Sequence, residues 1–199
     1  MTEANGRRAD HPIDPWFLER WSPRAFTGEP IPDAALMTLL EAARWAPSSY
    51  NAQPARFIYA RRDTPAWPIF FGLLVEGNQR WCRNAAALII VVSRTTMDLP
   101  GRPAPVASHT HSFDAGAAWA CLALQGARSG WDAHGMIGFD LARARTELHV
   151  PDDFRVEAAI AIGKRGDRSL LPPDVAAREV PNTRRPLAES VMEGEFRGG

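Results

Sequence analysis

The chain has 199 residues, with 23 acidic and 23 basic side chains and 45% apolar residues. This length and apolar content are typical of one folded domain with a buried core, and they exclude a disordered chain. The balanced charge gives no bulk electrostatic reason to bind nucleic acid or an anionic membrane, and no run approaches the roughly 20 apolar residues that a spanning helix needs.

The N-terminal segment is polar. Residues 1–12, MTEANGRRADHP, predict a flexible tail, and a single domain is expected over residues 13–199. The tail has no apolar signal segment, which favours a cytoplasmic location. A short helix is expected in residues 14–20, with Asp14 as its N-cap.

A helix and a strand are expected next. Residues 32–46 have apolar side chains at helical spacing, which predicts an amphipathic helix capped by Asp33 and ended by Pro47. Residues 55–62, ARFIYARR, alternate and are rich in aromatic and β-branched side chains, so they predict a strand.

The middle of the chain is mostly apolar. Residues 65–84 predict a helical stretch broken near Gly77, and residues 85–93, AAALIIVVS, predict a central strand buried on both faces. Residues 94–110 are rich in proline and read as a loop.

A second strong helix is predicted over residues 111–130, ending near Gly130. One predicted face consists of Phe113, Ala117, Cys121 and Leu124. Its first half is rich in alanine and glycine, which predicts close packing of another backbone, either in the core or at a subunit interface.

The last third predicts a short helix in residues 139–150 and a strand in residues 154–163. Residues 164–199 show little periodicity, so we expect them to pack on another part of the molecule or on another subunit. The order of elements predicts an α+β fold with a small central sheet covered by helices.

Three polar clusters are candidates for binding. Arg20, Ser22 and Arg24 offer planar and hydroxyl donors that suit a phosphate, although a solvated charged turn has the same composition. Arg184 and Arg185 lie between prolines, where a solvated tail is the alternative.

The third cluster lies between two prolines in residues 47–54. It is made of polar side chains that could bind a ligand or simply satisfy the backbone of a turn: Ser48, Ser49, Asn51 and Gln53, after Pro47.

Other candidate groups are weaker. His109 and His111 have a spacing seen in metal sites, but only Asp114 lies near them, so no complete site is indicated. Cys82 and Cys121 are expected to be buried thiols rather than a disulfide. No nucleotide-binding glycine motif or nucleophile elbow is present.

Taken in order, these motifs resemble the flavin-dependent nitroreductase family. The resemblance covers residues 16–192 and rests on these elements: Arg20-x-Ser22-x-Arg24, the 47–54 segment, Asn78 before the apolar strand, the small-residue helix, Gly138-Phe139-Asp140, and the PNTRRPL segment. It implies a nitroreductase-like fold with a mostly antiparallel sheet and a C-terminal arm that extends onto a partner subunit.

The resemblance also implies FMN at the interface of a homodimer. Arg20, Ser22, Arg24, Arg184 and Arg185 would contact the phosphate or the flavin edge. The pyrimidine part of the ring would meet Asn78, and the reactive middle would meet Met136, Ile137 and Gly138. The partner subunit would contribute Pro47, Ser48, Ser49, Asn51 and Gln53.

The implied activity is transfer of a hydride from NADH or NADPH through flavin N5 to a nitroaromatic, quinone or similar small-molecule acceptor, in a ping-pong cycle. No metal and no side-chain nucleophile are needed. The alternatives are a specialised relative, such as a reductive dehalogenase or a flavin-cleaving enzyme, and a non-catalytic FMN-binding module.

Two positions depart from the family pattern. Some relatives have a lysine where Asn182 stands, and some have a cation where Trp81 stands. We therefore expect one cation fewer near the phosphate and one fewer near the ring.

Overall fold

The computed structural model describes residues 2–197, which fold around a four-stranded sheet. The strand order is β3-β4-β8-β7, and every pairing in this sheet is antiparallel. The strands are β3 (Ala55–Arg61), β4 (Ala87–Arg94), β8 (Phe154–Gly163) and β7 (Asp132–Met136). The predicted α+β fold with a small antiparallel sheet is thus confirmed.

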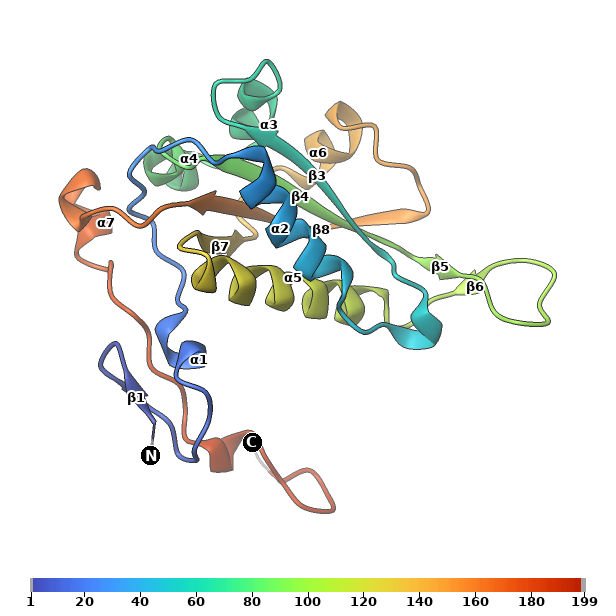
Figure 1. Ribbon diagram of the computed structural model, residues 1–199. Helices are drawn as coiled ribbons and strands as arrows, with labels where there is room; N and C mark the ends of the chain where they lie inside the picture. Colours follow the sequence, from blue (N-terminus) through green and yellow to red (C-terminus); the bar gives the residue numbers. More distant parts are fainter. Residues whose placement is uncertain (1, 198–199) are drawn as a thin grey trace.

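Helices cover both faces of the sheet (Figure 1). The helices α2 (Asp33–Arg44) and α5 (His111–Arg128) lie on one face, and α3 (Trp67–Leu73), α4 (Glu76–Cys82) and α6 (Leu141–Glu147) lie on the other. In β4, Ile89 and Val91 join the core below α2 and α5, whereas Leu88 and Ile90 join the opposite core. This alternation explains why the strand is apolar without interruption, as predicted for a central strand.

The pairing of the two central strands contains a β-bulge. Val91 pairs with Ala158 and Val92 pairs with Val156, so Glu157 is the extra residue of β8. A bulge changes the direction in which the extra side chain points. Here the extra residue is a carboxylate, the only acidic side chain of β8.

The N-terminal and C-terminal segments lie side by side, outside the layers (Figure 1). The strands β1 (Glu3–Ala4) and β2 (Arg7–Arg8) form a hairpin, followed by α1 (Trp16–Glu19). The hairpin lies within the segment expected to be a flexible tail, and its turn residues Asn5 and Gly6 both have positive φ, as a tight hairpin turn requires.

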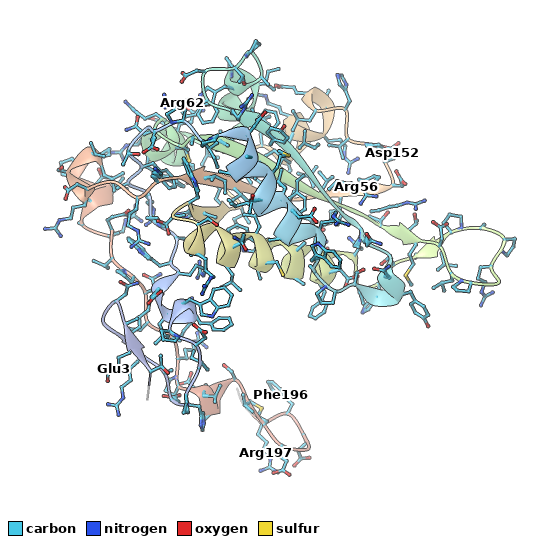
Figure 2. All side chains as sticks on the ribbon, viewed as in Figure 1. Glu3, Arg56, Arg62, Asp152, Phe196 and Arg197 are labelled. Atoms are coloured by element: carbon cyan, nitrogen blue, oxygen red, sulfur yellow. The ribbon has the colours of Figure 1, made fainter. Side chains whose placement is uncertain are left out.

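The C-terminal segment begins with α7 (Pro173–Ala176) and continues as an arm, residues 177–197. The arm contacts the N-terminal segment, because the backbone N–H of Leu187 donates to Asp10 Oδ2 at 2.9 Å. Figure 2 shows Glu3 on the hairpin and Phe196 near the end of the arm, both away from the sheet.

Several local predictions need correction. The long helix begins at Asp33, so the N-cap is Pro32, and Asp33 instead pairs with Arg61 at 2.7 Å. The break in the 65–84 stretch falls at Leu74 and Val75 rather than at Gly77, because these residues leave the helical region between α3 and α4.

The predicted face of α5 was also wrong. Phe113 is 80% exposed, and the core side of the helix is formed by Ala115, Ala118, Leu122 and Ala123. Within the predicted loop of residues 94–110 the chain forms a small hairpin of β5 (Thr96–Met97) and β6 (Val106–Ala107).

Candidate functional site

A small cationic cavity lies between the N-terminal segment and the arm. It has a volume of about 130 Å³ and is lined by Arg7, Arg20, Trp21, Ser22, Arg24, His134, Val180, Asn182 and Arg184. The structure therefore brings together four of the residues predicted to contact a phosphate. Arg185, the fifth, is exposed and does not line this cavity. We refer below to this cavity between the N-terminal segment and the arm as the anion cavity.

The arginines of the anion cavity repel one another. Burial lowers the pKa of Arg20, and the charge of Arg184 lowers it further, while Asp132 opposes the shift. Burial, Arg184 and Arg20 all lower the pKa of Arg7. A cluster of like charges that is partly removed from water favours a bound anion.

Unpartnered donors of the same cavity also indicate an anion site. Arg7 Nε and Trp21 Nε1 are buried, and neither has a hydrogen-bond acceptor within the described part of the chain, residues 2–197. Buried N–H groups without an acceptor are rare in folded proteins, because each costs about 1–3 kcal/mol. The donor set of the anion cavity therefore fits a multidentate acceptor such as a phosphate.

A larger cavity adjoins the anion cavity at His134, which lines both. It has a volume of about 670 Å³. Its walls are Val75, Asn78, Val91, Ser112, Ala115, Gly116, Trp119, His134, Gly135, Met136, Ile137, Gly138, Glu157, Ala158 and Ile160. All four residues predicted to contact a ring line this volume, which we call the ring cavity. The donors of the anion cavity and the mostly apolar walls of the ring cavity together have the chemistry to bind one molecule with an anionic end and a planar apolar end.

The Asn78 side chain is held in a fixed orientation. Its Nδ2 donates to the carbonyl of Gly138 at 2.9 Å, and its Oδ1 accepts from Trp81 Nε1 at 3.2 Å. Asn78 lies in the first turn of α4, not at the helix end that the sequence indicated. Each half of the amide keeps one further hydrogen-bonding position, which suits a ring edge with both donors and acceptors.

His134 is fixed at the junction of the two cavities. Its Nδ1 lies 3.0 Å from the carbonyl of Pro23, and its ring packs on Trp81 with centroids 4.6 Å apart. Burial lowers the pKa of His134, although the bond to Pro23 opposes the shift. The structure thus explains the position of Trp81: the indole orients Asn78 and supports His134.

The polar segment of residues 47–54 lines a separate cavity. This cavity, of about 560 Å³, includes Pro47, Ser48 and Gln53 among its walls, whereas Ser49 and Asn51 lie outside it. It contacts α5 through Asp114 and Ala118, and the ring cavity contacts α5 through Ser112, Ala115, Gly116 and Trp119. At 3.6 residues per turn these two sets lie on different faces of the helix, so one chain does not bring the segment to the ring cavity.

The backbone of this segment is strained. The backbone φ angles are 51° at Tyr50, 54° at Asn51 and 48° at Gln53. Residues other than glycine rarely adopt this left-handed region. Ser48 Oγ accepts from the Gln53 N–H at 3.0 Å, and Asp114 Oδ2 accepts from the Ser49 N–H at 3.2 Å. Strain of this kind is concentrated at functional sites.

Comparison with known proteins gives a consistent result. The model of the nitroreductase family matches residues 18–66. A crystal structure described as an oxidoreductase containing FMN is 51% identical, with a TM-score of 0.96 and complete coverage of both chains. The chain belongs to the nitroreductase family.

Two further relatives support this family membership. A provisionally assigned nitroreductase from Desulfovibrio desulfuricans, solved in complex with FMN, is 28% identical with a TM-score of 0.69, over 94% of this chain and 100% of that one. A protein of Rhodopseudomonas palustris strain TIE-1, provisionally named NADH dehydrogenase/NAD(P)H nitroreductase, is 26% identical over 82% of this chain and 90% of its own. This nitroreductase-family chain is therefore an oxidoreductase.

A polar network in the wall of the ring cavity was not predicted from the sequence of this chain. Glu157, on the bulge, accepts from Ser93 Oγ at 2.5 Å and from Ser112 Oγ at 2.7 Å. His111 Nδ1 lies 2.7 Å from Ser93 Oγ. His111 therefore has an internal partner, and the described residues contain no group of three or more histidine, cysteine or carboxylate side chains that could hold a metal ion. The sequence signal for this network is a glutamate at the edge of the apolar run AAIAI in the predicted strand.

The remaining sequence expectations concern the thiols and the membrane. Cys82 is a buried free thiol, as predicted, and burial raises its pKa; Cys121 is also a free thiol, but it is half-buried rather than buried as predicted. Across residues 2–197 there is no helix with the length and apolar content to cross a membrane.

Proposed function

We propose that this chain is an FMN-dependent oxidoreductase. It takes a hydride from NADH or NADPH and passes it to a nitroaromatic, a quinone or a similar acceptor in a ping-pong cycle. The observation that carries this proposal is the junction at His134 between a cationic cavity and a larger, mostly apolar one. FMN has a phosphate and a planar ring system, which match the two cavities in order.

The residues fit each part of the cofactor. Arg20, Arg24 and Arg184, with the hydroxyl of Ser22, would bind the phosphate through charge-assisted hydrogen bonds. The role predicted for Arg185 at the flavin edge remains a prediction, since this residue lies outside the anion cavity. The family relatives that contain FMN give independent support.

The ring would be oriented by the other cavity. The amide of Asn78 would bind the pyrimidine edge with the donor and acceptor positions that Gly138 and Trp81 leave open. Met136, Ile137 and Gly138 would lie along the middle of the ring.

The bound flavin would supply the hydride acceptor and donor atom, N5. The protein would exclude water with the apolar walls formed by α5 and β8 and would hold the ring in place. No side-chain nucleophile is needed for this chemistry.

A homodimer would complete the site. Ser48, Ser49, Asn51 and Gln53 lie away from the ring cavity of their own chain, so they would reach the ring cavity of a second copy. Large apolar side chains near this segment are exposed: Trp45 by 74%, Tyr50 by 73% and Phe113 by 80%. Exposed apolar side chains grouped in this way are typical of an interface.

The first experiment is a visible absorption spectrum of the purified protein, followed by anaerobic addition of NADH and, separately, NADPH. We expect a yellow protein that one of the two donors bleaches. A yellow protein that neither donor bleaches would favour a non-catalytic FMN-binding module. A colourless protein that FMN does not reconstitute would refute the proposed function.

Mixed subunits test the homodimer. One double variant, Ser48→Ala with Asn51→Ala, is altered only in the segment that would reach the partner subunit. The other, Arg20→Ala with Arg24→Ala, is altered only in the anion cavity. After unfolding and refolding together, random pairing restores about a quarter of the sites, since half of the dimers contain one intact site. If each site belongs to one chain, mixing restores no activity.

A further inference from the structure

We propose that Arg7, on the N-terminal hairpin, is a phosphate-binding residue of the cofactor site. This inference rests on the proposed FMN site and adds a residue from a segment that the sequence analysis treated as a tail. Arg7 lines the anion cavity together with Arg20, Arg24 and Arg184. It would supply the positive charge that the neutral side chain of Asn182, in the same cavity, does not provide.

The Arg7 guanidinium is already held in place by the protein. Its Nη1 donates to the carbonyl of Leu18 at 3.0 Å and to the carbonyl of Arg20 at 2.8 Å. These bonds join the hairpin to the chain segment that carries Arg20. A guanidinium anchored at one nitrogen loses little further freedom when another nitrogen binds a ligand, which favours tight binding.

One nitrogen of the group lacks a partner. Arg7 Nε is buried and has no acceptor among residues 2–197, and the same is true of Trp21 Nε1 in the wall of the same cavity. An anionic oxygen bound in the cavity would satisfy these donors once the atoms that cover them shift to admit it.

The charge around Arg7 also favours a bound anion. Burial lowers the pKa of Arg7 most, and the charges of Arg184 and Arg20 lower it further. The carboxylate of Glu179 lies 3.8 Å from Arg24, on another part of the cluster. A phosphate dianion would reverse the repulsion among Arg7, Arg20 and Arg184, so it would bind to the whole group.

The alternative is that Arg7 only fastens the hairpin to the body through its two carbonyl bonds. The two roles make different predictions for two ligands that share the same ring system. FMN has the phosphate, and riboflavin does not. A residue that binds the phosphate affects the first ligand alone, whereas a residue needed only for the fold affects both.

The test measures dissociation constants of the flavin-free protein by quenching of flavin fluorescence. Arg7→Ala should weaken FMN binding by about 10- to 100-fold, the usual effect of losing a hydrogen bond to a charged group, and should leave riboflavin binding within about twofold. Arg7→Gln removes the charge and keeps a side-chain N–H donor on a shorter side chain, so it tests the loss of charge with part of the polar character retained. It should weaken FMN binding in the same selective way.

Arg8→Ala is the matched control. Arg8 is the neighbouring residue of the same strand, pairs with Glu3 at 3.8 Å and does not line the anion cavity. Its replacement should change neither constant. The proposal is overturned if Arg7→Ala binds FMN as tightly as the unmodified protein, or if FMN and riboflavin lose affinity equally. Unmodified protein that binds neither flavin would refute the proposed function as well as this inference, which distinguishes the two failures.

Discussion

Replacement of Gly138 by alanine tests the geometry of the ring cavity most directly. A Cβ at this position would lie 2.5 Å from Asn78 Nδ2 and 3.1 Å from Val75 Cγ2. Asn78 cannot move aside freely, because its amide is bonded to the Gly138 carbonyl and to the Trp81 indole. We therefore expect Gly138→Ala to break both bonds and to displace the amide from the cavity.

The size of the effect follows from these contacts. Two hydrogen bonds worth about 1 kcal/mol each give a loss of about 2 kcal/mol in the free energy of unfolding. For a chain of this length this corresponds to a fall of about 4–8 °C in Tm. Because the amide would also leave the pyrimidine edge, FMN affinity should fall by about tenfold.

The assay is thermal and urea unfolding of the flavin-free protein, with FMN affinity measured separately. Gly77→Ala is the control, since Gly77 lies next to Asn78 on α4 and a Cβ there would meet no atom within 4 Å. Its replacement should leave stability unchanged or raise it by up to about 0.5 kcal/mol. A Gly138→Ala protein with the same Tm as the unmodified protein would show that the Asn78 contact does not constrain this site.

Three other predictions concern the support of the site. Glu179→Ala should lower the free energy of unfolding by about 3 kcal/mol, because Glu179 Oε1 accepts from the backbone N–H groups of Arg24 and Ala25 at 2.7 and 2.8 Å; an unchanged urea midpoint would contradict this. Burial lowers the pKa of His134 below 6.5, so its neutral form stabilises the fold above pH 6.5 and this contribution is lost as the pH falls through the folded-state pKa. Urea titrations from about pH 7 to about pH 5 should therefore show a smaller loss in the free energy of unfolding for His134→Phe than for the unmodified protein. An equal loss in both proteins would refute the role of His134 in this pH dependence. Both Tyr50→Gly and Tyr50→Ala remove the aromatic side chain, but only glycine relieves the left-handed backbone, worth about 1 kcal/mol, so Tyr50→Gly should have the higher Tm; a Tm no higher than that of Tyr50→Ala would show that the segment is not strained.

The long elements could be predicted from the sequence because local pattern and tertiary burial agree. In α2 the apolar spacing places Leu36 and Leu39 in the core, and in β4 the unbroken apolar run matches burial on both faces. The strand β7 was missed because DAHGM has little strand propensity of its own. Pairing with β8 imposes the extended conformation, and this information is not local.

The residues of the candidate site likewise include some that the sequence could predict and some that it could not. Arg20, Ser22, Arg24 and Arg184 could be proposed because their spacing matches a family pattern, and the structure brings them together. Arg7 gave no such signal, since its role depends on a hairpin that folds back on the chain. Glu157 was missed because a bulge changes the face on which a residue lies, and alternation along the strand does not reveal it.

The contact between Asp10 and Leu187 joins residues 177 positions apart, so it links the two ends of the chain across almost its whole length. An exposed hydrogen bond of about 1 kcal/mol is weak against the cost of ordering a backbone, which is about 1–2 kcal/mol for each residue. An anion held by Arg7 from one end and Arg184 from the other would act as a non-covalent crosslink. Loss of the cofactor and fraying of both ends then become a single event, and the rate at which a protease cuts the arm reports how much of the protein is loaded.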